Sequence, residues 1–108
     1  MDLNELSEQI HDTAIKHGWW KENRNFGEVL ALIHSEVSEV LEDWRNGMEF
    51  HAISMDEGKP TGIPIEMADI LIRVLDACAG LEINIQRAVE IKMAYNQGRP
   101  YRHGGKIA

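Results

Sequence analysis

The sequence predicts an all-α protein with one domain, and three observations lead to this prediction. Residues Ile65 to Leu81 are apolar almost throughout and contain no proline, which is typical of a buried helix. Apolar residues recur every three or four positions over residues 26–44, the period of an amphipathic helix. A chain of 108 residues is long enough for one modest core. The expected architecture is a four-helix bundle-like protomer that spans residues 1–108.

Capping residues and helix breakers set the expected boundaries of the helices. Asp2, with Glu5 three residues later, resembles a capping box, and Asn84 is suited to the N-cap of the last helix. Pro64 is suited to the first turn of the third helix. Residues 48–64 are rich in glycine and proline, so we expect a loop there, with a short helical turn near residues 50–55. The expected helices span about residues 3–17, 26–46, 64–80 and 85–97.

Charge is unevenly distributed along the chain. All 18 acidic residues lie at or before Glu90, so residues 1–91 carry a formal charge of −11, whereas residues 92–108 carry +4. An acidic body argues against binding to a nucleic-acid backbone, which requires a basic face. A short cationic C-terminal segment on an acidic body indicates that the protein binds small anions, phosphate among them. The expected partners therefore do not include a nucleic-acid polymer.

The cysteine content and the N-terminus indicate a cytoplasmic protein. Cys78 is the only cysteine, so no intrachain disulfide can form, which fits a reducing compartment. The first residues lack the basic and apolar regions of a signal peptide. The apolar run of the third helix carries four charges and is too short for a typical transmembrane span, so no membrane partner is expected.

The charged residues of the third helix lie on one stripe. Glu66, Asp69, Arg73 and Asp76 are spaced three, four and three apart, whereas the other faces are apolar. Charges inside a core must be paired or must bind a metal, because an isolated buried charge is costly. One interpretation is a structural ion-pair network between Arg73 and acids of its own helix. The other is a metal site, which requires further carboxylates.

The second helix offers such carboxylates at Glu36 and Glu39. Residues three apart on a helix are neighbours, so these like charges repel unless a cation lies between them. If this pair faces Glu66 and Asp69, four hard oxygen ligands converge, a set that suits Mg²⁺, or Mn²⁺, and not zinc. Asp43 or Asp76 can supply one more carboxylate, because each continues the acidic line of its helix.

Candidate substrate-binding residues lie near the C-terminus and between the first two helices. Lys92, Asn96 and Arg99 share a stripe that we expect to face the core and its carboxylates, although Lys92 can instead extend into solvent. The following segment adds cations, and two glycines would allow close approach to phosphate. One of two adjacent tryptophans can stack on a base, or both can close the core. The candidates in these two segments are Arg102 and Lys106, and Trp19 and Trp20.

Together these motifs resemble the MazG-like all-α nucleoside triphosphate pyrophosphohydrolases, a family related to dimeric dUTPases. The family pattern Glu-Glu-x-x-Glu followed by Glu-x-x-Asp matches residues 35–39 and 66–69, with Ser35 in place of the first glutamate. The segment Lys92…Asn96…Arg99 resembles the family's Lys-x-x-x-Asn-x-x-Arg. The resemblance extends from about Trp19 to Lys106. By the helical period, Ser35 points away from Glu36 and Glu39, the two acids of its motif. The identity of the residue that activates water is therefore not determined.

The resemblance implies Mg²⁺-dependent hydrolysis of a nucleoside triphosphate to the monophosphate and pyrophosphate. It implies that Glu36, Glu39, Glu66 and Asp69 form the catalytic metal site. It also implies a homodimer or homotetramer, which agrees with a third helix that is apolar on nearly every face. The alternative is a catalytically silent helical oligomeric adaptor or a metal-binding regulatory protein. Neither the base nor the sugar of the nucleotide follows from these residues.

Overall fold

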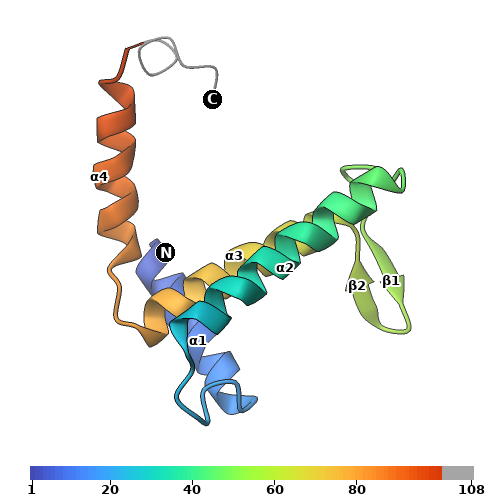
Figure 1. The fold of residues 1–108 in the computed structure, drawn as a ribbon, viewed down its shortest axis with the longest axis horizontal. Coiled ribbons are helices and arrows are strands. Elements are labelled where there is room, and N and C mark those ends of the chain that lie inside the picture. The colour runs from blue at the N-terminus through green and yellow to red at the C-terminus, as the bar shows by residue number, and fades with distance from the viewer. Residues whose placement is uncertain (101–108) are drawn as a thin grey trace.

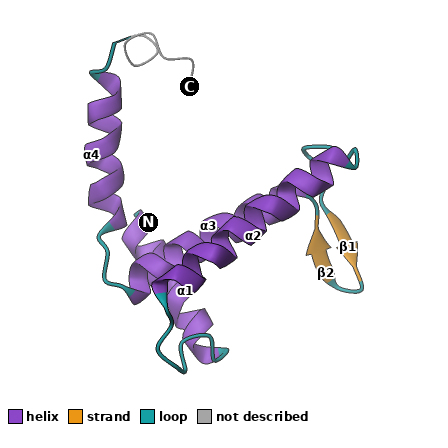
Figure 2. Ribbon diagram, in the orientation of Figure 1, coloured by secondary structure: helices purple, strands orange, loops and turns teal. Residues whose placement is uncertain are grey.

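The computed structural model describes residues 1–100, and these residues are mostly helical (Figure 1). Figure 2 shows one short β-hairpin besides the helices. The elements follow in the order α1 (Leu3–Lys16), α2 (Phe26–Arg45), β1 (Ser54–Asp56), β2 (Lys59–Thr61), α3 (Ile63–Gly80) and α4 (Ile85–Gln97). This confirms the all-α class, and each helix ends within one residue of its predicted boundaries. In the described residues, no helix is both long and apolar enough to cross a lipid bilayer.

The predicted caps explain where the helices begin. The Asp2 side chain accepts a hydrogen bond from the backbone N–H of Glu5 at 2.8 Å, and Asn84 accepts one from Arg87 at 3.1 Å. These bonds satisfy backbone donors that have no partner within the first turn of a helix. Pro64 lies in the first turn of α3, where a missing N–H costs nothing.

Helix α3 is the centre of the fold, because α1 and α2 both pack on it (Figure 1). Leu75 of α3 is only 1% exposed, and the other buried apolar side chains belong to α2 and α3. Ser7 of α1 is also buried, and its hydroxyl donates to the carbonyl of Leu75. These contacts fix α1 and α2 on two sides of α3 and so define the groove described below.

Residues 54–61 between α2 and α3 form a hairpin, so the prediction of a loop is wrong for these residues, and no helical turn of the kind predicted near residues 50–55 is present. Strands β1 and β2 pair antiparallel, with Met55 opposite Pro60. Glu57 and Gly58 connect them with positive φ angles of 51° and 82°, which match the turn that the twist of a hairpin favours. The strands have three residues each, and nearly all of their residues are exposed, so they show no apolar alternation that would reveal them in the sequence.

Helix α4 stands apart from the other three (Figure 1). Its main contacts are with α1, and none of its residues is buried. Hydrogen bonds fix its first turn to the start of α1: Gln86 accepts from the backbone N–H of Leu3 at 2.9 Å, and the Asn4 amide donates to Asn84 at 2.8 Å. Within one chain, α4 therefore does not complete a four-helix bundle with the other helices.

Candidate metal and nucleotide site

Four acidic residues lie near one another where α2 and α3 lie side by side (Figure 1). Glu39 and Asp43 lie one turn apart on α2, and Glu66 and Asp69 lie one turn apart on α3. The pKa of Glu66 is raised to about 7, mainly because its carboxyl shares a hydrogen bond with that of Asp43. Burial and the negative charges of Asp43, Glu39 and Asp69 raise it further. We call these four residues the carboxylate cluster.

Glu36, the remaining predicted ligand, has a different partner. Its Oε1 atom accepts a hydrogen bond from Nε of Arg73 at 2.7 Å, and its side chain is only 13% exposed. The interpretation that Arg73 pairs with acids of its own helix is therefore wrong, because its partner lies on α2. Three of the four predicted ligands therefore lie near one another and near Asp43, whereas Glu36 is in an ion pair with Arg73.

The carboxylate cluster has the donor chemistry of a hard cation site. The Oε2 atom of Glu66 is buried and has no hydrogen-bond partner within residues 1–100. Carboxylate oxygens of this kind are ligands for Mg²⁺ or Mn²⁺. In the same residues, however, no three Asp, Glu, His or Cys side chains converge closely enough to bind a metal ion as they stand. The donor atoms fit the cation in type, and their carboxylates would have to draw closer around it.

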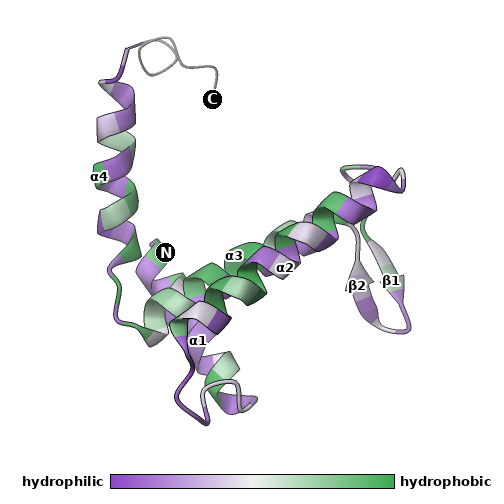
Figure 3. Cartoon of the chain, viewed as in Figure 1, coloured by the Kyte–Doolittle hydropathy of each residue, from purple (hydrophilic) through white to green (hydrophobic). Residues whose placement is uncertain are grey.

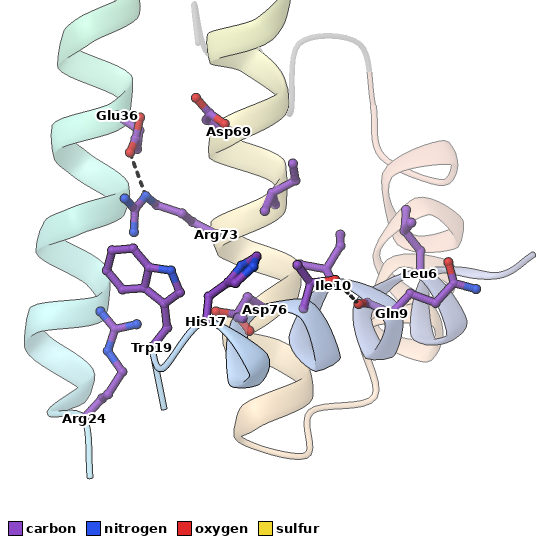
Figure 4. A pocket seen from close by; sticks show the side chains of 13 residues that line it. Leu6, Gln9, Ile10, His17, Trp19, Arg24, Glu36, Asp69, Arg73 and Asp76 are labelled. Atoms are coloured by element: carbon purple, nitrogen blue, oxygen red, sulfur yellow. Dashed lines mark hydrogen bonds and ion pairs between the residues drawn. The ribbon is translucent and has the colours of Figure 1, made fainter. Parts of the chain in front are cut away.

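A groove of about 510 Å³ begins beside these acids and runs between α1 and α2, across α3 (Figure 4). This volume lies within the range of small-molecule sites. Asp69, Glu36 and Arg73 line one end of the groove, and Trp19 and Arg24 follow beside Arg73 in Figure 4. The apolar side chains of α1 and α3 on its walls are Leu6, Ile10, Ala14 and Ile72.

Trp20, one of the two candidate stacking residues, is part-buried and held by Asp76, and it does not line this groove. Its Nε1 atom donates to both carboxylate oxygens of Asp76, at 2.9 and 3.0 Å, and His11 pairs with the same carboxylate at 2.8 Å. The His11 and Trp20 rings also meet edge to face, with centroids 5.0 Å apart. The Trp20 ring packs so closely on Gly80 that a Cβ atom there would clash with it. Asp76 is therefore an anchor for the segment between α1 and α2.

Trp19 takes the position on the groove. Its side chain is 54% exposed, and two guanidinium groups lie near its ring. The Cζ atom of Arg24 is 5.8 Å from the ring centroid and that of Arg73 is 5.9 Å from it. The sequence left open which of Trp19 and Trp20 would stack on a base. It gave no signal for Arg24, because the position of Arg24 depends on how the segment between α1 and α2 folds.

The predicted cationic stripe of α4 does not meet the carboxylates within one chain. Lys92 and Asn96 are exposed, and Lys92 and Arg99 both lie over the ring of Tyr95, at 4.8 and 5.3 Å from its centroid. The prediction that this stripe faces the core is therefore wrong for the single chain. Arg102 and Lys106 lie outside the described residues. Comparisons with protein-family models, with curated proteins and with solved structures find no match to this chain.

Proposed function

We propose that this protein hydrolyses a nucleoside triphosphate to the monophosphate and pyrophosphate in a reaction that requires Mg²⁺. The observation that supports this most strongly is the carboxylate cluster, in which a hydrogen bond shared with Asp43, then burial and the neighbouring negative charges, raise the pKa of Glu66 to about 7. A protein gains nothing in stability from such a cluster unless a cation neutralises it. The resemblance to MazG-like pyrophosphohydrolases supplies the reaction.

In this proposal Glu39, Glu66 and Asp69 bind the metal, and Asp43 or Glu36 completes the set. When bound, Mg²⁺ would neutralise part of the negative charge of the phosphates. A carboxylate of the cluster orients a water molecule and accepts its proton. The water oxygen forms a bond to the α-phosphorus while the bond from that phosphorus to the bridging oxygen breaks, and pyrophosphate leaves with the electron pair.

We also propose a homodimer or homotetramer. A substrate with several negative charges needs cations near the carboxylate cluster, and within one chain the cations of α4 lie away from it. Lys92, Asn96 and Arg99 are the proposed phosphate or sugar ligands, together with Arg102 and Lys106. A second copy can bring α4 to the cluster. Apolar residues on one stripe of α2 support such an association, since each is between 43% and 55% exposed: Phe26, Leu30, Val37, Leu41 and Trp44.

Figure 3 shows hydrophobic residues along α2 and on α4, the two helices that this association would cover. Ile91, Met93 and Tyr95 of α4 are more than half exposed. An isolated helix of this length is marginal in water, so α4 gains from a packing partner. With its single cysteine, Cys78, buried and reduced, the protein fits the cytoplasm, where the proposed reaction would maintain the nucleotide pool.

A panel of nucleoside triphosphates assayed for pyrophosphate release tests the reaction. We expect release with millimolar Mg²⁺ or Mn²⁺ and none with chelator. We also expect Mg²⁺ to raise the melting temperature, because a ligand that binds only the folded state stabilises it by mass action.

The exposed stripe of α2 also fits the alternative, a helical oligomeric adaptor or a metal-binding regulatory protein, since either class needs an apolar docking face. The same measurements separate the three. A melting temperature that rises with Mg²⁺ in the absence of any turnover would favour the regulatory protein. No metal response and no turnover would favour the adaptor.

A further inference from the structure

The groove offers a cation that the proposed reaction has not used. Arg24 precedes α2, is half-buried and lines the groove beside Trp19. Within residues 1–100 it has no carboxylate partner and no side-chain hydrogen bond, in contrast to Arg73, which is paired with Glu36 at 2.7 Å. Its guanidinium lies near both tryptophan rings, 5.8 Å from the centroid of Trp19 and 5.5 Å from that of Trp20. Its donors therefore remain available to a ligand in the groove.

Arg24 lies where the sugar and base of a nucleotide would lie if its phosphates were bound at the carboxylate cluster. Asp69 belongs to the carboxylate cluster, and Asp76, which anchors Trp20, lies seven residues farther along α3, about 10 Å by helix rise. Figure 4 shows Arg73, Trp19 and Arg24 in succession away from Asp69 and Glu36. A nucleotide whose phosphates lie at the cluster would place its sugar and base along this line, with the exposed Trp19 ring beside the base.

We propose, building on the function proposed above, that Arg24 reads the base of the nucleotide and selects bases that carry a carbonyl oxygen. A guanidinium group has only donors, so it needs an acceptor on the base edge. Guanine offers O6 beside N7, and cytosine, uracil and thymine offer carbonyl oxygens, whereas adenine offers only ring nitrogens as acceptors and has an amino donor beside N7 in place of O6, which the guanidinium fork cannot pair with. Trp19 and the neighbouring Trp20 hold the guanidinium plane in place by cation–π contacts.

The first arm of the test is steady-state kinetics with GTP, CTP, UTP and ATP in Mg²⁺. We expect the wild type to prefer the first three. Arg24→Met should lower kcat/KM for those three by about tenfold or more, through KM, because a charge-assisted hydrogen bond is lost. ATP should change by less than about twofold, so that the preference disappears. An equal loss for all four nucleotides would overturn the inference, since Arg24 would then act on phosphate or on folding.

Arg45→Met is the matched control, because Arg45 lies on α2 with its side chain 66% exposed and pairs only with Glu42 at 3.9 Å. This variant should leave the whole panel unchanged. Arg24→Lys separates charge from hydrogen-bond geometry, because lysine keeps the charge but not the planar fork. It should recover little of the base preference. Full recovery would contradict base reading by the guanidinium fork.

The second arm does not need turnover, which makes failure of this inference distinguishable from failure of the proposed function. Ligand-observed NMR in chelator compares guanosine, cytidine, uridine and adenosine. We expect the first three to bind the wild type in preference to adenosine, and Arg24→Met to lose this difference. Binding of this kind without hydrolysis would refute only the enzyme. Hydrolysis without an Arg24-dependent preference would refute only the base reading, and neither hydrolysis nor binding would refute both.

Discussion

At the scale of single residues, Glu66 is the group whose titration reports on the site. Its pKa is raised from 4.5 to about 7, so between these values the folded chain binds a proton that the unfolded chain has lost. The free energy of unfolding should therefore fall as pH rises from about 4.5 to about 7. We expect Glu66→Gln to reduce this fall when unfolding by urea is measured in chelator at pH 5 and pH 8.

Glu42→Gln is the control for this experiment, because Glu42 is an exposed glutamate of α2 outside the cluster. It should keep the pH dependence of the wild type. If Glu66→Gln shows the same loss of stability between the two pH values as the wild type does, then Glu66 is not the group that titrates near neutrality.

Asp43 and Glu36 should respond in opposite directions when their charges are removed. Asp43→Asn relieves repulsion in the carboxylate cluster, so in chelator at pH 8 it should raise the free energy of unfolding. Glu36→Gln leaves Arg73 without its charged partner and should lower the same quantity by up to about 1 kcal/mol. Urea unfolding of both variants under one condition measures the signs. Two changes of the same sign would contradict the assignment of Asp43 to the cluster and Glu36 to the ion pair.

Asp43 and Glu36 also show which features of the site could be predicted from the sequence. The helical period placed Glu36, Glu39 and Asp43 along one side of α2, and it offered Asp43 or Asp76 as a further carboxylate. The period does not give the offset between two helices that lie side by side. That offset decides that Asp43 meets Glu66 and that Arg73 meets Glu36, so the pairing became visible only in the structure.

At the scale of elements, the segment between α1 and α2 depends on Asp76. This carboxylate accepts the Trp20 indole N–H and pairs with His11, so it connects the segment to both α1 and α3. Asp76→Ala leaves the part-buried indole donor without a partner and should lower the free energy of unfolding by about 1–3 kcal/mol. Asp12→Ala, an exposed position on α1, should cost far less. Equal effects in urea unfolding would show that Asp76 is no anchor.

The elements themselves were predicted with unequal success. The four helices were predicted within one residue because caps, breakers and apolar period agree there. The hairpin was missed because its strands are short and exposed, and Pro60 within β2 argues against a strand. Only Glu57 and Gly58, the tight turn, gave a local signal, and the wider run of glycine and proline around them favoured a loop.

At the scale of the whole molecule, one chain leaves a large apolar surface exposed. Its radius of gyration is 16.6 Å, whereas a compact domain of about 100 residues has about 13 Å. The sequence predicted the apolar stripe of α2 but could not say which molecule covers it. In the structure α4 is directed away from α2 and α3 (Figure 1) and is hydrogen-bonded to the start of α1 through Asn4 and Gln86, so the stripe of α2 remains open.

We therefore expect sedimentation at micromolar concentration to show a dimer or tetramer. Leu41→Lys places a charge on the exposed stripe of α2 and should shift the protein toward monomer, since burying an unpaired charge is costly. Ser38→Lys adds the same charge to an exposed position off that stripe and should leave the assembly intact. A wild type that sediments only as a monomer would refute the oligomer.

The central claim is that the carboxylate cluster hydrolyses a nucleoside triphosphate between its α- and β-phosphates. Chromatographic identification of the products, from wild type and Glu66→Gln with Mg²⁺, tests it most directly. We predict nucleoside monophosphate and pyrophosphate in equal amounts from the wild type, and a loss of at least about a hundredfold in rate from the variant. Nucleoside diphosphate with phosphate as products, or a fully active Glu66→Gln, would contradict the claim.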